Sequence, residues 1–350
     1  MFDELLKTVS VDIATVRAII QTNEQLRIII FSKASATKPE LLENTEFNSL
    51  LKAVPDELNW QVYDHCAVVT RLYAIYEKFV KNLISDWLAL LPYLVPNYSN
   101  LDKKIQDTHQ EGVGILLRDL KNNDRFDHLS PEKVVRSLFS AITDNENYEL
   151  IPDAFTLHKQ NLRKEALEQL FVGVGIKNAW EWVINHRDIK NFVEEVRGSQ
   201  NTAEGELKQL VKYRNEAAHG LSLVDQTLGT EDLLILGDFV EALCKALAEL
   251  VSYHVISKKF DIGKAKEIGT IRHWLDNIKV ARAKVKEVTL SIGDSLFLVK
   301  ENCSYCQLVT IESIRDKEVA KDQVEITDEK DIHLKFDSDA RKGLSLYVIE

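Results

Sequence analysis

The sequence predicts a mainly α-helical protein with a small β domain at its C-terminal end. The chain has 350 residues, of which 45% are hydrophobic, but only 13 are glycine and 6 proline. So few turn-forming residues favour long helices over many short strands. Up to about residue 260, apolar residues recur near the 3.6-residue helical period, whereas short β-branched or alternating segments follow after about residue 285.

The helical part is predicted from its apolar pattern and its helix-start and helix-stop residues. Ser130-Pro131-Glu132 is a helix-start signal, and the hydroxyls of Thr202 and Thr230 are placed as N-caps. Gly220 can supply a left-handed C-terminal residue. The widest apolar helix, the centre of a bundle, is expected to end at Pro92, Pro96 and the Asn-Tyr-Ser-Asn segment that follows. We expect helices over residues 1–32, 40–53, 57–91, 100–121, 131–143, 160–172, 177–197, 203–219 and 231–258.

The C-terminal segments predict a small β barrel or β sandwich. They are short and separated by Gly, Asn and Asp turns, and they cover residues 288–292, 295–299, 307–311, 333–336 and 344–349. The chain therefore divides into a helical domain over residues 1–260, a basic linker or helix over 261–285, and an all-β domain over 286–350.

The charge of the chain limits what it can bind. It has 44 basic and 55 acidic residues, a net charge of -11, which argues against a broad, sequence-blind nucleic-acid coat but leaves room for a local basic site. The N-terminus carries Asp3 and Glu4 where a secretory signal would be basic, and no stretch approaches the roughly 18 apolar residues of a membrane span. We expect a cytoplasmic protein without membrane contact.

The four cysteines predict no metal site. Cys66 and Cys244 fall within apolar helical patterns, as buried thiols do, and Cys303 and Cys306 form a lone C-x-x-C. A zinc site needs two further ligands, and the nearby sequence offers no second pair. We therefore expect neither a metal nor a cofactor.

The residues with the clearest chemical potential are Arg214, Asn215 and His219, at the end of the helix expected over 203–219. Histidine ordinarily has a pKa of about 6.5, so it can take a proton from a ribose 2′-hydroxyl near neutral pH. A guanidinium can stabilise the negative charge that builds on the attacked phosphate, and this reaction needs no metal. In the alternative reading, Arg214 lies along the helix surface and His219 only caps the helix end.

This pattern resembles the R-x4-6-H motif of the HEPN superfamily, in which a polar residue commonly follows the arginine. The central helix supports the resemblance, since Tyr73 to Ile84 looks like the helix that packs beside the motif helix in these proteins. Within it, Glu77 and Lys81 match an E-x3-K pattern found in several of the families. The resemblance covers roughly residues 1–260, with a long helical insertion between the two signature helices.

The resemblance implies a metal-independent endoribonuclease that dimerises through the motif helix, with one composite active site at the two-fold axis. Arg214 would stabilise the transition state, Asn215 would orient the phosphate or the histidine, and His219 would be the general acid or base. Glu77 would hold Arg214, with Lys81 beside it; the alternative for Glu77 is an ordinary solvated glutamate on the helix surface. Implied partners are RNA, with tRNA among the candidates, a second copy of the chain, and a restraining antitoxin or defence-system partner in prokaryotic antiviral defence or toxin-antitoxin biology.

A second candidate RNA contact lies between residues 258 and 286, where nine basic residues stand against three acidic ones, a local charge of +6. Lys279, Arg282 and Lys284 are the RNA-binding residues expected there. Two other functions remain open: a non-catalytic dimeric scaffold in which Arg214 and His219 only stabilise the interface, and the toxin half of a toxin-antitoxin pair.

Overall fold

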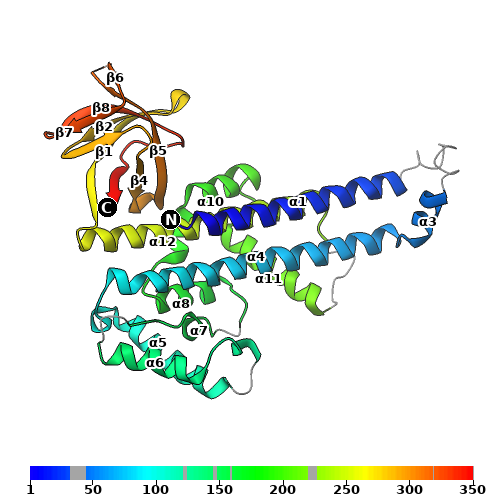
Figure 1. Ribbon diagram of the computed structural model, residues 1–350. Helices are drawn as coiled ribbons and strands as arrows, with labels where there is room; N and C mark the ends of the chain where they lie inside the picture. The colour runs from blue at the N-terminus through cyan, green and yellow to red at the C-terminus, as the bar shows by residue number, and fades with distance from the viewer. Residues whose placement is uncertain are drawn as a thin grey trace.

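The computed structural model describes residues 1–31, 45–120, 124–144, 148–157, 160–219, 227–317 and 319–349. A long helical body occupies most of the molecule, and a β barrel sits at one end of helix α12 (Figure 1). The predicted class, a mainly α protein with a C-terminal β domain, is confirmed, and of the two β architectures expected the barrel is correct.

Four long helices form the bundle. Helix α4 (Glu57–Leu94) packs against α1 (Asp3–Phe31), α11 (Ala203–His219) and α12 (Thr230–Asp261), and α1 also packs against α12. Helices α1 and α4 run side by side away from the barrel, with α3 (Thr45–Ala53) at their far end (Figure 1).

The insertion between α4 and α11 is a set of short helices, of which the first four lie on the side of α4 opposite α1 and the last two pack against α12 (Figure 1). Its helices are α5 (Lys103–Asp119), α6 (Pro131–Ile142), α7 (Pro152–Phe155), α8 (Lys164–Gly173), α9 (Ala179–Asn185) and α10 (Arg187–Asn191), with single turns η2 (Tyr98–Asn100), η3 (Asp124–Phe126) and η4 (Phe192–Val196).

Helix α4 forms because its sequence provides an N-cap for the first turn and apolar residues for the buried faces. The Asp56 carboxylate accepts a hydrogen bond from the Asn59 amide at 2.9 Å, which caps the first turn. Its apolar residues recur every three or four positions from Val68 to Leu94, and they are buried. The helix ends at Leu94, between the two prolines expected to end it. Pro92 itself lies inside the last turn, where a proline removes one backbone hydrogen bond while buried side chains on both sides hold the backbone helical.

Two further local predictions need correction. The single helix expected over 177–197 is broken at His186, whose backbone is extended and whose buried ring accepts a hydrogen bond from the Asp188 amide at 3.3 Å. Thr230 is the first residue of α12 and not its N-cap, because its hydroxyl donates to Glu24 at 2.7 Å. The cap at Thr202 is confirmed, since its hydroxyl accepts from the Gly205 amide at 3.0 Å, and Gly220 lies outside the described residues.

The β barrel is closed by six antiparallel strands in the order β4-β9-β1-β2-β8-β5, because β5 pairs back onto β4. Strand β6 pairs with the C-terminal end of β5, and β3 and β7 form a separate two-stranded sheet. The strands are β1 (Ala265–Leu275), β2 (Val280–Val285), β3 (Val288–Ser291), β4 (Ser295–Lys300), β5 (Tyr305–Asp316), β6 (Val319–Lys321), β7 (Gln323–Ile326), β8 (Lys330–Phe336) and β9 (Ser345–Ile349).

The segment 261–285, expected as a basic linker or helix, instead contains strands β1 and β2. The buried residues of β1 are Ala265, Ile268 and Ile271, three residues apart, and a register shift in the pairing with β9 inserts an extra residue between Glu267 and Gly269. That spacing imitates a helix, so alternation could not reveal the strand. Gly269 lies within the irregular stretch, where a Cβ would fall 2.0 Å from the Lys284 carbonyl oxygen, so the two backbones approach closely.

The barrel shares a core with the helical body through Phe297, Val299 and Cys306. A buried ion pair lies at the same junction: Arg187 of α10 donates to both carboxylate oxygens of Glu249 on α12, at 2.8 and 2.5 Å. The barrel completes this cluster. The Cys306 amide donates to Glu249 at 3.2 Å, and the Arg187 guanidinium lies 4.3 Å from the centre of the Tyr305 ring.

Burial by itself would raise the pKa of Glu249, but hydrogen bonds from His186 and Arg187 outweigh it and lower the pKa to about 2. The carboxylate therefore stabilises the fold when ionised. Because its folded pKa lies below the ordinary value of about 4.3, this stabilisation is complete above the unfolded pKa and is lost as the pH falls towards 2.

None of the helices in the described ranges is both long and apolar enough to cross a membrane.

We predict that Glu249→Gln lowers the free energy of unfolding by about 3–5 kcal/mol at pH 7, because it leaves the buried Arg187 without its counter-charge. Urea unfolding at pH 7 and pH 3.5 measures this, and the difference between wild type and variant should shrink at the lower pH. Glu312→Gln is the control, since Glu312 pairs with Lys335 while both side chains are 44% exposed, and it should cost less than about 1 kcal/mol. Equal losses in the two variants would contradict the prediction.

Candidate functional site

The three motif residues of helix α11, Arg214, Asn215 and His219, differ in solvent exposure. Its first half is anchored by buried Leu207, Leu210 and Val211 against the bundle core. In its second half Arg214 and Asn215 are half-buried, and His219, the last helical residue, is exposed. The helix thus fixes the arginine and the asparagine next to the protein and leaves the histidine at the surface.

Arg214 is held by two contacts, and a third contact fixes one of its partners. Its guanidinium lies over the ring of Tyr73 of α4, 5.0 Å from the ring centre, and its Nη1 donates to the side-chain oxygen of Asn215 at 3.1 Å. The same oxygen accepts a second hydrogen bond, from the amide nitrogen of Asn161 at 2.8 Å. Asn215 therefore links the arginine to the insertion, and its side-chain orientation is fixed by two donors.

The peptide segment that carries Asn161 is itself held by α4. The Leu162 amide donates to the hydroxyl of Tyr73 at 3.0 Å, and the hydroxyl of Tyr76 donates to the Leu162 carbonyl at 3.2 Å. Burial raises the pKa of Tyr73, so this hydroxyl stays protonated in the neutral range. Tyr73 thereby serves twice, as the surface under Arg214 and as the acceptor that places Asn161.

The two supporting residues expected on α4, Glu77 and Lys81, form an ion pair with each other at 2.7 Å. Within the described part of the chain, no hydrogen bond or ion pair joins Glu77 to Arg214, so the structure does not bring them into direct contact. Glu77 lies near the same tyrosine, since its charge contributes to raising the pKa of Tyr73. Glu77 therefore lies near Tyr73 without taking part in the contact between Tyr73 and Arg214.

His219 differs from Arg214 in direction. Five residues separate the two, which in a straight α-helix corresponds to a rotation of about 140° and a rise of about 7.5 Å. Across the residues that the structure describes, the imidazole of His219 makes no hydrogen bond, so both ring nitrogens are open to a ligand. Arg214 and His219 of one chain thus face different sides of α11.

A buried histidine that the sequence analysis did not single out, His65 of α4, also contacts α11. His65 of α4 accepts a hydrogen bond from the Leu228 amide at 3.1 Å and packs edge-on against Tyr213, with ring centres 5.2 Å apart. Burial lowers the pKa of His65, which keeps the ring neutral and its Nδ1 an acceptor. These contacts place the start of α12 beside the second half of the motif helix. Only its position in an apolar pattern hinted that His65 is buried.

The predicted RNA-binding residues lie on the barrel, away from the motif. Lys279 precedes β2, and Arg282 and Lys284 point outward from it. Each is paired with a carboxylate: Lys279 with Asp339 at 3.4 Å, Arg282 with Asp331 at 2.7 Å, and Lys284 with Glu329. The sequence could not show these pairings, because their acidic partners come from β8 and the neighbouring turns, some 45 to 60 residues later in the chain.

The Asn161 contact was also missed by sequence reasoning. Asn161 stands 54 residues before Asn215, and no spacing rule connects them. Within the described residues, no group of three or more His, Cys, Asp or Glu side chains could hold a metal ion. Cys303 is exposed and Cys306 is buried, and both are free thiols.

A helical bundle with an arginine, a following asparagine and a surface histidine at the end of one internally packed helix defines a HEPN-type domain. The comparison with family models agrees. The model described as RiboL-PSP-HEPN matches residues 38–253, well over half of the chain, and the chain belongs to this family of the HEPN superfamily. The match spans α4, α11 and most of α12, and includes Arg214, Asn215 and His219.

Two other comparisons add little. No curated protein matches the chain. Among solved structures, the C-terminal domain of a proposed U32 peptidase from Geobacillus thermoleovorans matches with 12% identity and a TM-score of 0.21, covering 23% of this chain and 96% of that one.

We predict that Tyr73→Phe lowers the free energy of unfolding by about 1–3 kcal/mol, because the buried Leu162 amide loses its acceptor. Amide hydrogen exchange should show faster exchange at Leu162. Tyr93→Phe on the same helix is the matched control, since Tyr93 is 73% exposed, and it should change neither quantity. Unaltered exchange at Leu162 would contradict the role given to Tyr73.

Proposed function

We propose that this protein is a metal-independent endoribonuclease of HEPN type. The observation that supports this most is the contrast between the two charged motif residues. Arg214 is fixed by Tyr73 and Asn215, as a group that must meet a phosphate in a set geometry would be, whereas His219 is exposed and its ring makes no hydrogen bond to any residue that the structure describes. A merely structural cap would be expected to donate to the last carbonyls of its helix.

The chemistry follows from these positions. His219 takes the proton of a ribose 2′-hydroxyl, the 2′-oxygen attacks the adjacent phosphorus, and the 5′-oxygen leaves with a proton from an imidazolium. The products are a 2′,3′-cyclic phosphate and a 5′-hydroxyl. Arg214 stabilises the charge on the phosphate oxygens in the transition state, and Asn215, held by Asn161, keeps the guanidinium in place.

A composite site in a homodimer is part of the proposal. Because Arg214 and His219 of one chain face different sides of α11, a phosphate between two antiparallel motif helices can meet the arginine of one protomer and the histidine of the other. Two protomers would also supply a base and an acid, which the two proton transfers need.

The proposed substrate is RNA, with tRNA among the candidates, and the proposed setting is prokaryotic antiviral defence or a toxin-antitoxin pair in the cytoplasm. Such an enzyme must be held inactive until needed, so we propose a restraining partner. Lys279, Arg282 and Lys284 remain proposed RNA contacts, with the condition that RNA phosphates replace the carboxylates that now pair with them.

We predict that His219→Ala lowers the rate of RNA cleavage by about 100-fold or more in the presence of EDTA, because the reaction loses its general acid and base. Total RNA and purified tRNA are the substrates, and end analysis should find 2′,3′-cyclic phosphate only with the active protein. His128→Ala is the control, since His128 lies 58% exposed on the insertion, and it should cleave like wild type. Equal behaviour of wild type and His219→Ala, on RNA and in cell toxicity, would favour the non-catalytic scaffold.

A mixing experiment tests the composite site. Arg214→Ala and His219→Ala should each be inactive as homodimers, whereas heterodimers formed after refolding the two together should regain a measurable part of the wild-type rate. One intact arginine and one intact histidine then meet at the same interface. Heterodimers that form but do not cleave would rule out complementation between protomers.

A further inference from the structure

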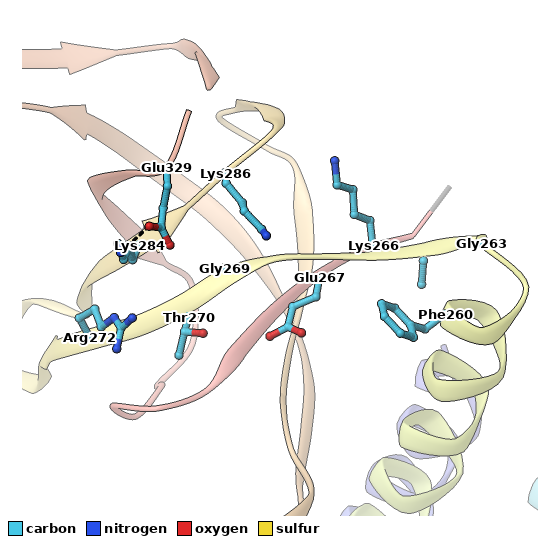
Figure 2. A pocket seen from close by; sticks show the side chains of 11 residues that line it. Phe260, Gly263, Lys266, Glu267, Gly269, Thr270, Arg272, Lys284, Lys286 and Glu329 are labelled. Atoms are coloured by element: carbon cyan, nitrogen blue, oxygen red, sulfur yellow. Dashed lines mark ion pairs between the residues drawn. The ribbon is translucent and has the colours of Figure 1, made fainter. Parts of the chain in front are cut away.

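A basic groove of about 670 Å³ opens on the outer face of the barrel, where α12 passes into β1 (Figure 2). Its lining includes four cationic side chains, Lys266, Arg272, Lys284 and Lys286, against two carboxylates, Glu267 and Glu329. A local charge of +2 in a chain with a net charge of -11 marks this groove as a place where an anion is attracted.

Two of the four cations are available to a ligand. Lys284 is paired with Glu329, and Lys266 with Glu287 at 3.1 Å. Arg272 and Lys286 are exposed, and their side chains make no ion pair or hydrogen bond within the part of the chain that the structure describes. In Figure 2 the two reach towards the groove from neighbouring strands.

An exposed aromatic ring closes the other end of the groove. Phe260, in the last turn of α12, is 50% exposed and packs edge-on against Tyr347, with ring centres 6.0 Å apart. A half-exposed phenylalanine beside cations places an aromatic face within reach of a bound anion. It suits a ligand with both negative charge and a flat ring.

We propose that this groove binds single-stranded RNA, with phosphates on Arg272 and Lys286 and one base stacked on Phe260. The inference rests on the proposed ribonuclease function and extends it to the substrate. Single-stranded RNA fits better than a duplex, because only an unpaired base presents its face to an aromatic side chain. An acidic peptide would use the cations but leaves Phe260 without a role.

The groove and the catalytic motif lie at opposite ends of α12. Contacts of His65 with Leu228 and Tyr213 place the start of α12 beside the motif helix, and Phe260 lies at its end. Thirty-two residues at about 1.5 Å each make α12 roughly 48 Å long. An RNA strand with a stacked spacing of about 3.4 Å per nucleotide needs on the order of 14 nucleotides to reach both ends within one protomer. The groove therefore favours long RNA substrates over short ones.

The test is fluorescence anisotropy with a labelled 20-nucleotide single-stranded RNA, in a His219→Ala background so that the RNA is not cut. Arg272→Gln with Lys286→Gln should weaken binding at least about fivefold and lower the slope of log affinity against log salt by about 1.4, since each contact contributes about 0.7. Phe260→Leu should weaken binding about fivefold or more. The matched control, Arg315→Gln with Lys317→Gln, removes two exposed cations of the same barrel outside the groove and should bind like its parent.

Equal binding by the groove variant and its parent would overturn the proposal, as would an equal loss in the control, which would indicate unspecific charge attraction. Tighter binding of a duplex or of poly-glutamate that depends on the same two cations would also overturn it. Cleavage separates this inference from the proposed function. If the protein with intact His219 cleaves RNA and the groove variant binds RNA like its parent, only the proposed role of the groove is wrong. RNA binding that depends on the groove, without cleavage by the wild type, would remove the ribonuclease function only.

Discussion

Burial of helix α4 is the constraint on which the rest of the helical body depends. Helices α1, α11 and α12 all pack against it, so its polar groups must find partners inside the protein. Tyr73 and Tyr76 bring two hydroxyls into this core, where an unsatisfied hydrogen-bonding group costs about 1–3 kcal/mol. The backbone of Leu162 satisfies both hydroxyls. The segment of the insertion before α8 is thus fixed by the need of two tyrosines for partners, and Asn161 reaches Asn215 as a consequence.

A similar requirement joins the barrel to the helices. Glu249 is buried at the face of α12 that the barrel covers, and it accepts hydrogen bonds from Arg187 and from the Cys306 backbone. A buried carboxylate is tolerated only with such partners, which come from α10 and β5. The shared cluster fixes how the barrel sits on α12, so the groove and the motif helix are held at opposite ends of one long helix.

The charge of a chain segment does not show which of its side chains are free to bind an anion after folding. The segment from 258 to 286 has a local charge of +6, yet folding pairs Lys279, Arg282 and Lys284 with carboxylates from later strands. Counting charges along the chain predicted an RNA contact in this segment. The pairing then separated the cations that support the barrel from Arg272 and Lys286, which remain available to an anion.

The order of residues along the chain was enough to specify the long helices, the β domain at the C-terminal end and the Arg214-Asn215-His219 motif. These features depend on periodicity and on neighbours within one or two turns, which a linear pattern records. The linear pattern did not predict strand β1, whose buried residues are three positions apart as in a helix. It also did not predict the break at His186, where a buried side chain interrupts a helix. The contacts that hold Arg214, the closure of the barrel, the ion pairs of β2 and the basic groove all join residues far apart in the chain. Folding in three dimensions settled them, because burial and hydrogen-bond satisfaction depend on which surfaces meet in space.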